Sequence, residues 1–147
     1  MNDLSNVSEV KLTYESKNRK KIKADTSAKA YVLMMTNWEQ IEYRESFKVL
    51  LLDVTKQALG INTVSMGGLS EAQVDVRMIM QAALLAKADG IVCVHNHPSG
   101  NVKPSIEDDI VTVKVIQACK TMGIELVDHL IIAPCGYYSY ADEGRFD

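Results

Sequence analysis

Hydrophobic and polar residues follow two different periods along this chain. Val10, Leu12 and Tyr14 alternate with polar residues, which is the pattern of a half-buried strand. Residues 47–52 and 91–95 are nearly continuous apolar runs. These runs are too short for average helices and are typical of strands covered on both faces.

The other segments add three strands and three helices. Further strands are expected at residues 60–65, 125–133 and 137–140. Helical spacing extends from Ser27 to about Trp38, from Val74 through Met78, Leu85 and Ala86 to Asp89-Gly90, and from Ser105 through Ile106, Ile110, Val113 and Ile116 to Gly123. Since strands and helices alternate, we expect an α/β sandwich with a mixed sheet.

Composition limits the protein to an ordinary globular class. The 147 residues are 47% hydrophobic, enough for one domain with a real core, and we expect a single domain over residues 1–147. A formal net charge of -3 gives no global argument for nucleic acid or membrane. The first residues do not resemble a signal peptide and no apolar run could span a bilayer, so a cytoplasmic location and no membrane partner are expected.

Cysteines and basic residues add little chemistry. Cys93, Cys119 and Cys135 form no C-x-x-C pair, so neither a disulfide framework nor a cysteine zinc site is indicated, and we expect small buried thiols. The basic stretch at residues 17–21, with Lys23, is interpreted as a solvated loop rather than a phosphate contact.

Three potential metal ligands occur within fourteen residues. His95 and His97 stand two residues apart at the end of a buried strand, so their side chains project to one side. Asp108 falls in the first turn of the next helix, and a turn at residues 98–101 can fold that turn back over the strand end. Two histidines and one carboxylate leave a coordination position open, as in catalytic zinc sites.

A hydrolytic site also needs a base, and the spacing leaves that choice open. Glu42, Glu45 and Asp53 all flank the strand at residues 47–52. Ser105 could donate its hydroxyl to an oxyanion. Ser105 and Asp108 also nearly form a capping box, and the capping and metal-binding roles are compatible.

These residues resemble the motif of the JAB/MPN metalloproteases, known as JAMM. In that motif a glutamate is followed at a distance by His-x-His, seven residues, Ser, two residues and Asp. His95, His97, Ser105 and Asp108 fit this spacing, and the segment at residues 94–100 resembles the RadC-like branch. Residues 44–53 resemble the segment that carries the family's glutamate, and residues 127–132 resemble a later strand of the branch. The similarity covers about residues 40–145, preceded by an N-terminal strand and helix extension at residues 1–39.

The resemblance implies a fold, a cofactor and a reaction. The fold is a three-layer-like sandwich with a mixed sheet flanked by helices, of the JAB/MPN and cytidine-deaminase-like kind. One Zn²⁺ per chain would be held by His95, His97 and Asp108, with Glu45 as the catalytic base and Ser105 at the oxyanion. The substrate would be a peptide, isopeptide or other amide, and the oligomeric state stays open.

Several alternatives accompany this reading. Glu45 could be a surface carboxylate paired with Arg44 or Lys48. Cys93 could approach the metal but is better explained as a buried thiol, and His129 could support the site or be purely structural.

The family also leaves room for other functions. The branch includes descriptions linked to DNA repair, so a nucleic-acid-interacting protein with a structural or nuclease metal, or a silent scaffold, are the rival functions. Longer members carry an N-terminal helix-hairpin-helix-like region, and with about forty residues before the matching part we do not transfer a DNA-binding role that depends on that region. Asp75-Val76-Arg77 departs from the proline that the branch places before the arginine.

Overall fold

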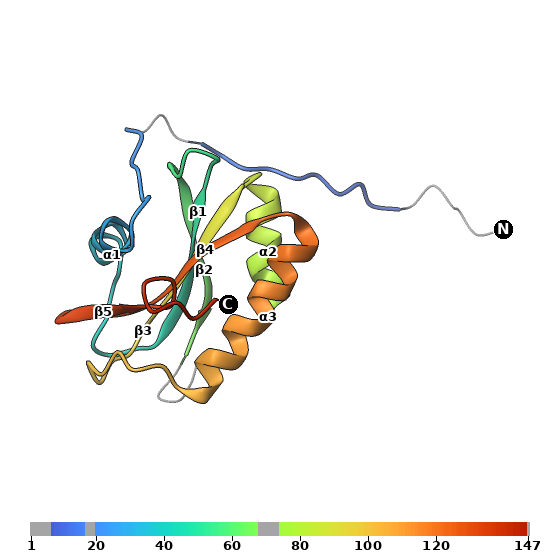
Figure 1. Ribbon diagram of the computed structural model, residues 1–147. Coiled ribbons are helices and arrows are strands. Elements are labelled where there is room, and N and C mark those ends of the chain that lie inside the picture. Colours follow the sequence, from blue (N-terminus) through green and yellow to red (C-terminus); the bar gives the residue numbers. More distant parts are fainter. Residues whose placement is uncertain (1–6, 17–19, 68–73, 147) are drawn as a thin grey trace.

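A mixed five-stranded sheet with helices on both faces forms the body of the protein (Figure 1). The computed structural model describes residues 7–16, 20–67 and 74–146. The elements in chain order are α1 (Ser27–Thr36), β1 (Ser46–Leu52), β2 (Ala58–Met66), α2 (Val76–Leu85), β3 (Gly90–Asn96), α3 (Ile106–Met122), β4 (Glu125–Ala133) and β5 (Gly136–Ser139). The expected α/β sandwich with a mixed sheet is confirmed.

Sheet order places β3 at the centre. The strands follow the order β2-β1-β3-β4-β5, in which β1 is antiparallel to β2 and β3, β3 is parallel to β4, and β4 is antiparallel to β5. Every residue of β3 is buried. Its continuous apolar run therefore has the environment that such runs favour.

Two apolar clusters fill the space between the sheet and the helices. Alternation along β1 sends Val49 and Leu51 into the cluster under α2 and α3, and Leu50 and Leu52 into the cluster under α1. Figure 1 shows α2 and α3 side by side on one face and α1 on the other. The face under α2 and α3 is the one that also carries the side chain of His95.

The buried face of α3 differs from the expected one. The expected apolar positions include Ile106, which is 75% exposed, and Ile110, which is 51% exposed. The buried positions are Thr112, Val115 and Cys119. These residues share a helix face with Asp108, so turning Asp108 toward the sheet turns the isoleucines outward. Met78 on α2 is likewise more exposed than its spacing predicted.

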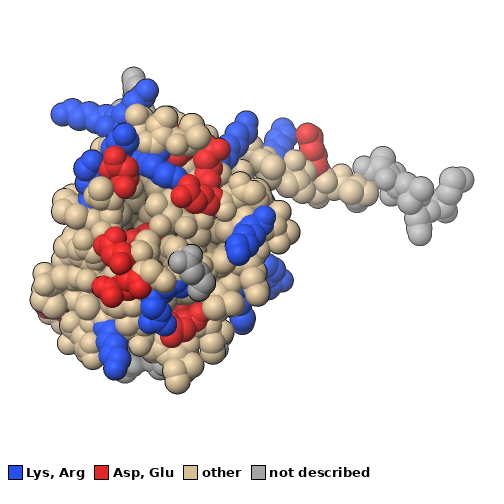
Figure 2. All heavy atoms as spheres, viewed as in Figure 1, with Lys and Arg blue, Asp and Glu red and all other residues tan. Residues whose placement is uncertain are grey.

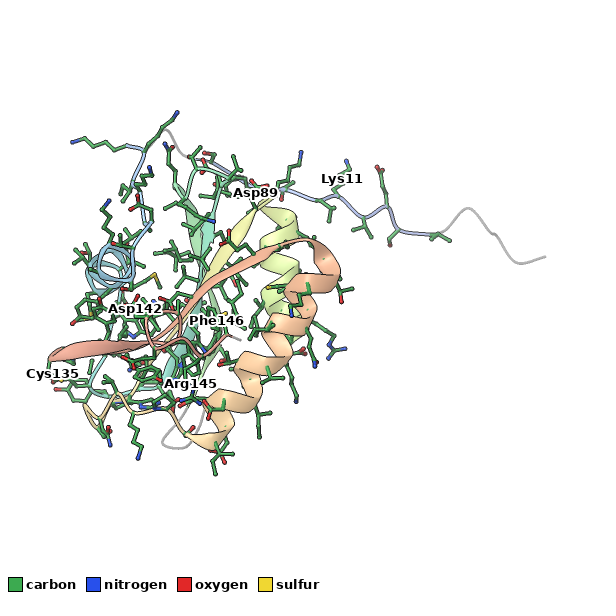
Figure 3. All side chains as sticks on the ribbon, in the orientation of Figure 1. Lys11, Asp89, Cys135, Asp142, Arg145 and Phe146 are labelled. Atoms are coloured by element: carbon green, nitrogen blue, oxygen red, sulfur yellow. The ribbon has the colours of Figure 1, made fainter. Side chains whose placement is uncertain are left out.

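The expected strand at residues 10–14 is wrong. Residues 7–16 belong to no helix or strand, and Val10 and Leu12 are largely exposed. Figures 1 and 3 show this segment, with Lys11 labelled, running away from the sheet. Alternation alone does not make a strand, because the backbone groups also need a hydrogen-bonded neighbour. Residues 17–19 of the basic stretch lie outside the described residues.

Two smaller expectations are also resolved by the fold. Cys93 and Cys119 are buried, but Cys135 is exposed at the turn between β4 and β5, so the expectation of buried thiols is wrong for that residue (Figure 3). Among the helices of the described segments, none is long and apolar enough to cross a membrane.

Candidate metal centre

The site forms where β1 begins and β3 ends. Because these strands are antiparallel and Phe47 pairs with His95, the residues just before Phe47 lie beside the residues just after His95. Glu45 therefore comes close to His97 without any long loop. Residues Glu45, Phe47, Val74, His95, His97, Ser105, Glu107, Asp108, Val111 and His129 line a pocket of about 140 Å³ at this point.

Three side chains with possible metal-donor atoms meet in this pocket. Nε2 of His95 lies 3.1 Å from Nε2 of His97 and 3.0 Å from Oδ1 of Asp108. Nε2 of His97 lies 3.3 Å from Oδ2 of Asp108. All three side chains are largely buried, with 3%, 17% and 13% of their surface exposed. The structure thus brings together the three side chains that the sequence predicted as metal ligands, and metal binding itself stays a prediction.

The hydrogen bonds behind His95 fix which of its nitrogens carries the proton. Thr112 donates its hydroxyl proton to the carbonyl of Asp108 at 2.7 Å. Its oxygen therefore accepts from Nδ1 of His129, at 2.6 Å. Burial holds the pKa of His129 well below its ordinary value, so this ring is neutral and its Nε2 is an acceptor. Nδ1–H of His95 then donates to that Nε2 at 2.9 Å, which leaves a lone pair on Nε2 of His95.

His97 is oriented in the same way by the backbone. Its Nδ1 lies 2.7 Å from the carbonyl oxygen of Asn101, which can only accept. Nδ1 is therefore the donor, and the lone pair of the neutral ring is on Nε2. Both histidines consequently point an acceptor nitrogen at the carboxylate of Asp108.

This donor set fits a tetrahedral metal ion. Donor atoms bound to zinc at about 2.0–2.1 Å in a tetrahedron lie about 3.3 Å apart, close to the separation of the two Nε2 atoms and to the distance from each of them to one oxygen of Asp108. Three converging acceptors repel one another unless a proton or a cation lies between them. Two imidazoles and one carboxylate are also ligand types that zinc and several other divalent ions accept.

Asp108 belongs to the site and to the cap of α3. Its Oδ2 accepts from the backbone N–H of Ser105 at 2.8 Å, while Oγ of Ser105 accepts from the N–H of Asp108 at 3.1 Å. Burial by itself would raise the pKa of Asp108, but hydrogen bonds from His95 and His97, made when a ring carries a proton on Nε2, hold that pKa well below its ordinary value. The hydrogen bond between protonated His97 and Asp108 raises the pKa of His97, and nearby Glu45 adds to that shift. The predicted capping box is present and coexists with the donor set.

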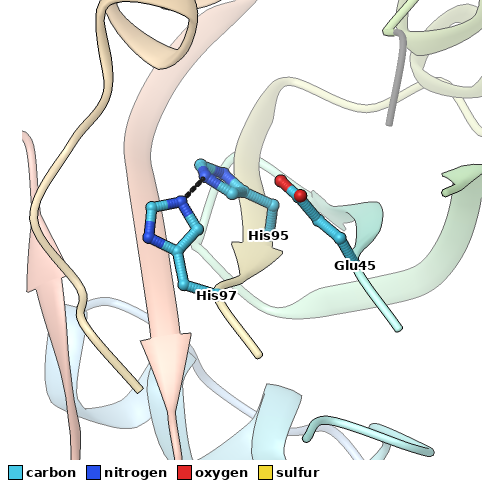
Figure 4. Close-up of side chains that lie close together, drawn as sticks. All are labelled: Glu45, His95 and His97. Atoms are coloured by element: carbon cyan, nitrogen blue, oxygen red, sulfur yellow. Dashed lines mark hydrogen bonds between the residues drawn. The ribbon is translucent and has the colours of Figure 1, made fainter. Parts of the chain in front are cut away.

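Glu45 reaches the two histidines from the chain just before β1. Figure 4 shows its carboxylate directed toward His95. One carboxylate oxygen of Glu45 and one nitrogen from each of His95 and His97 all lie within 4.8 Å of one another. Glu45 is therefore a second carboxylate in reach of the same ion, and it is half-buried rather than a surface residue. Neither Glu42 nor Asp53, the two alternatives that spacing left open, lines this pocket.

His129 is wedged between two aromatic rings. It stacks on Tyr140 with ring centroids 4.8 Å apart, and Phe47 packs against it at 5.7 Å. This packing holds His129 against Nδ1 of His95, the ring nitrogen that faces away from Asp108. His129 therefore supports a candidate ligand. The sequence did not single out Thr112 or Asn96, whose contacts reach this region. Thr112 lies one turn after Asp108 on the same helix face, and this four-residue spacing could have predicted that Thr112 also faces the site.

Comparison with known proteins identifies the family. Residues 24–145 match the family described as the RadC-like JAB domain. The chain belongs to this family. The match begins at residue 24, so α1 lies within the part of the chain that the JAB domain includes.

Curated relatives of this JAB domain carry names without an activity. A "UPF0758 protein" of Thermotoga maritima is 37% identical over 125 residues, which are 84% of this chain and 54% of the relative. One of Salinibacter ruber is 44% identical over 104 residues (71% and 45%), and one of Porphyromonas gingivalis is 44% identical over 102 residues (69% and 45%). The chain thus spans about half the length of these relatives.

The helix start that departs from the branch is intact in this JAB domain. Asp75 is the N-cap of α2 and accepts from the N–H of Arg77 at 2.9 Å, so Val76 is the first helical residue. That position tolerates proline well because its N–H has no partner inside the helix. Replacing proline by valine there leaves the donor atoms of the site in place.

Proposed function

We propose that this chain is a zinc-dependent hydrolase of amide or isopeptide bonds, with His95, His97 and Asp108 as the metal ligands. The observation that carries the proposal is the convergence of three acceptor side chains, with atoms 3.0–3.3 Å apart, beside a second carboxylate. Zinc bound there would act as a Lewis acid toward water and toward a substrate carbonyl.

Glu45 is the base in this proposal. Asp108 is tied to the helix cap through Ser105, which suits a fixed ligand, whereas Glu45 lines the same pocket from the segment just before β1. A carboxylate in that position can take a proton from the attacking water and deliver it to the leaving nitrogen. One side chain then performs the two proton transfers that amide hydrolysis requires, removal of a proton from water and protonation of the leaving nitrogen.

Ser105 is proposed to stabilise the oxyanion. Its oxygen accepts from the N–H of Asp108, so the hydroxyl proton remains able to donate elsewhere. Ser105 lines the same pocket as Glu45 and both histidines. A carbonyl oxygen bound in the pocket would gain a hydrogen bond that strengthens as negative charge develops on it.

Two measurements test the proposal. Mass spectrometry of protein purified without chelators should find about one zinc per chain in the wild type and none in His95→Ala. A library of fluorogenic peptide amides and isopeptides should then yield a cleaved substrate, and Glu45→Gln should lose turnover while keeping zinc. Zinc loss in Glu45→Gln, or retained turnover, would contradict the role of Glu45.

The same preparations check the rival functions. Lysine, arginine and acidic side chains occur side by side over the face in Figure 2, so that face offers no uniform basic surface. A salt-dependent shift of labelled DNA at physiological ionic strength would nevertheless favour the nucleic-acid alternative. A wild type that binds zinc and cleaves nothing would favour a scaffold.

A further inference from the structure

Asn96 stands between the two histidines and turns to the other face of the sheet. Successive residues of a strand point to opposite faces, so Asn96 faces away from the pocket that His95 and His97 share. Its side chain is fully buried. A buried primary amide must find hydrogen-bond partners for its donors and its acceptor, or folding loses stability.

The three hydrogen-bond partners of the Asn96 side chain all come from the segment that carries Glu45. Nδ2 of Asn96 donates to the carbonyl oxygens of Ile41, at 2.7 Å, and Arg44, at 2.8 Å. Oδ1 accepts from the N–H of Ser46 at 2.8 Å. The amide therefore holds the peptide groups immediately before and after Glu45.

Two further contacts complete the anchoring of this segment. The carbonyl of Glu45 accepts from the N–H of Gly67 at 2.8 Å, which ties it to the end of β2. Upstream, Gln40 has a positive φ of 55°, and its carbonyl accepts from the N–H of Arg44 at 3.2 Å. The turn thus aims the carbonyls of residues 41 and 44 at Asn96.

The chemistry at this position is specific to asparagine. Two carbonyl oxygens need two donors, and one N–H needs an acceptor, on a side chain short enough to stay at the strand end. An ionised aspartate has no donor, serine has one, and glutamine is longer by a methylene. One side chain of β3 therefore sets the distance between the backbone of Glu45 and the two histidines that flank Asn96.

We propose that Asn96 is a positioning residue that fixes Glu45 relative to His95 and His97 by clamping the backbone on both sides of Glu45. This inference rests on the proposed function, in which Glu45 is the base. Misplacing a catalytic group by about 1 Å costs on the order of 100-fold in rate, so a side chain that never touches substrate can control turnover.

The test compares zinc-loaded wild type with Asn96→Ala, the near-isosteric Asn96→Asp, and Ser139→Ala. Ser139 is a buried hydroxyl that donates to Asp128 at 2.6 Å, so Ser139→Ala controls for losing a buried hydrogen bond in the sheet. Both Asn96 variants should keep one zinc per chain and lose about 10- to 100-fold in kcat with little change in KM on the fluorogenic amide found in the screen. Ser139→Ala should keep the wild-type kcat.

Metal content separates positioning from general damage. Zinc should stay at one per chain in both Asn96 variants, because the hydrogen bonds that they lose join Asn96 to the backbone of residues 41, 44 and 46 and involve no metal-ligand side chain. Loss of zinc from both Asn96 variants would overturn the proposal.

Hydrogen exchange tests the clamp without any substrate. Amides of residues 41–46 should exchange at least about 10-fold faster in Asn96→Ala and Asn96→Asp than in wild type or Ser139→Ala. Unchanged exchange in that segment would overturn the proposal whether or not the protein cleaves amides. Conversely, a wild type that cleaves nothing would refute the proposed function and leave the clamp to be judged by exchange alone.

Discussion

Nδ1 of His95 donates a hydrogen bond to Nε2 of His129 across 2.9 Å, and both rings are buried. This bond makes the acceptor state of one candidate ligand depend on a residue 34 positions away on a neighbouring strand. The dependence continues to Thr112 on α3, which accepts from His129. Three elements therefore determine one lone pair.

Removing the partner behind His95 should weaken metal binding. His129→Gln and Thr112→Val are each expected to lower zinc affinity, by about 10- to 100-fold for His129→Gln and by less for Thr112→Val. Competition with a chromogenic chelator measures this, with circular dichroism as the check on folding. An unchanged affinity in both variants would mean that the bond does not tune His95.

The two roles of the α3 cap should be separable. Asp108→Asn keeps an oxygen that can accept from the N–H of Ser105, so the helix should form while zinc is lost. Ser105→Ala should retain zinc and lose about 1 kcal/mol of unfolding free energy, because the N–H of Asp108 loses its cap. Metal content and urea unfolding of the two variants distinguish these outcomes. Zinc retained in Asp108→Asn would remove Asp108 from the ligand set.

Tyr140 should make the protein sensitive to alkali. Burial and the hydrogen bond to Asp109 raise its pKa above the ordinary value of 10.0. The folded state then keeps a proton that the unfolded chain releases, so the stabilisation is complete below pH 10 and decreases as pH rises toward the folded pKa. The slope approaches about 1.4 kcal/mol per pH unit for this one group.

Tyr140→Phe provides the comparison for that pH dependence. It should lose about 1 kcal/mol near pH 8 through the missing hydrogen bond, yet show a flatter decline above pH 10. When the free energy of unfolding in urea is measured between pH 8 and 11, the values for wild type and Tyr140→Phe should therefore converge as the pH rises. Parallel curves would show that Tyr140 does not contribute to the alkaline transition.

Glycine should matter at the end of α3 but not in β2. Gly123 caps the helix with a φ of 68°, a conformation that costs other residues about 1 kcal/mol or more. Gly123→Ala should lose that amount in urea unfolding. Gly60 has no neighbour within 4 Å of an added Cβ, so Gly60→Ala is the matched control and should be close to neutral. Equal effects would argue against the cap.

The sequence predicted the sheet, and the meeting of His95, His97 and Asp108 in one pocket, because both depend on local pattern. The apolar runs of β1 and β3 are long enough to identify, and the spacing of His95, His97 and Asp108 is independent of the rest of the fold. The orientation of α3 was harder, because isoleucine and valine occur on both of its faces. The buried face of α3 is decided only by the requirement that Asp108 face the sheet.

Contacts between distant residues were beyond the sequence. In the sequence, Asn96 is one polar residue between two histidines. Its hydrogen bonds are made with a segment about 50 positions earlier in the chain, which the local pattern does not reveal. The strand expected at residues 10–14 failed for the complementary reason. Val10, Leu12 and Tyr14 do alternate with polar residues, but none of the described strands pairs with this segment.

Antiparallel pairing of Phe47 with His95 also limits how this protein can change in length. Loops at the far ends of β1 and β3 can gain or lose residues without moving the pocket. Deleting one residue between Glu45 and Phe47 would instead send the glutamate to the α1 side of the sheet, since successive strand residues alternate faces. Length variation is therefore expected to be tolerated at one end of this strand pair and forbidden at the other.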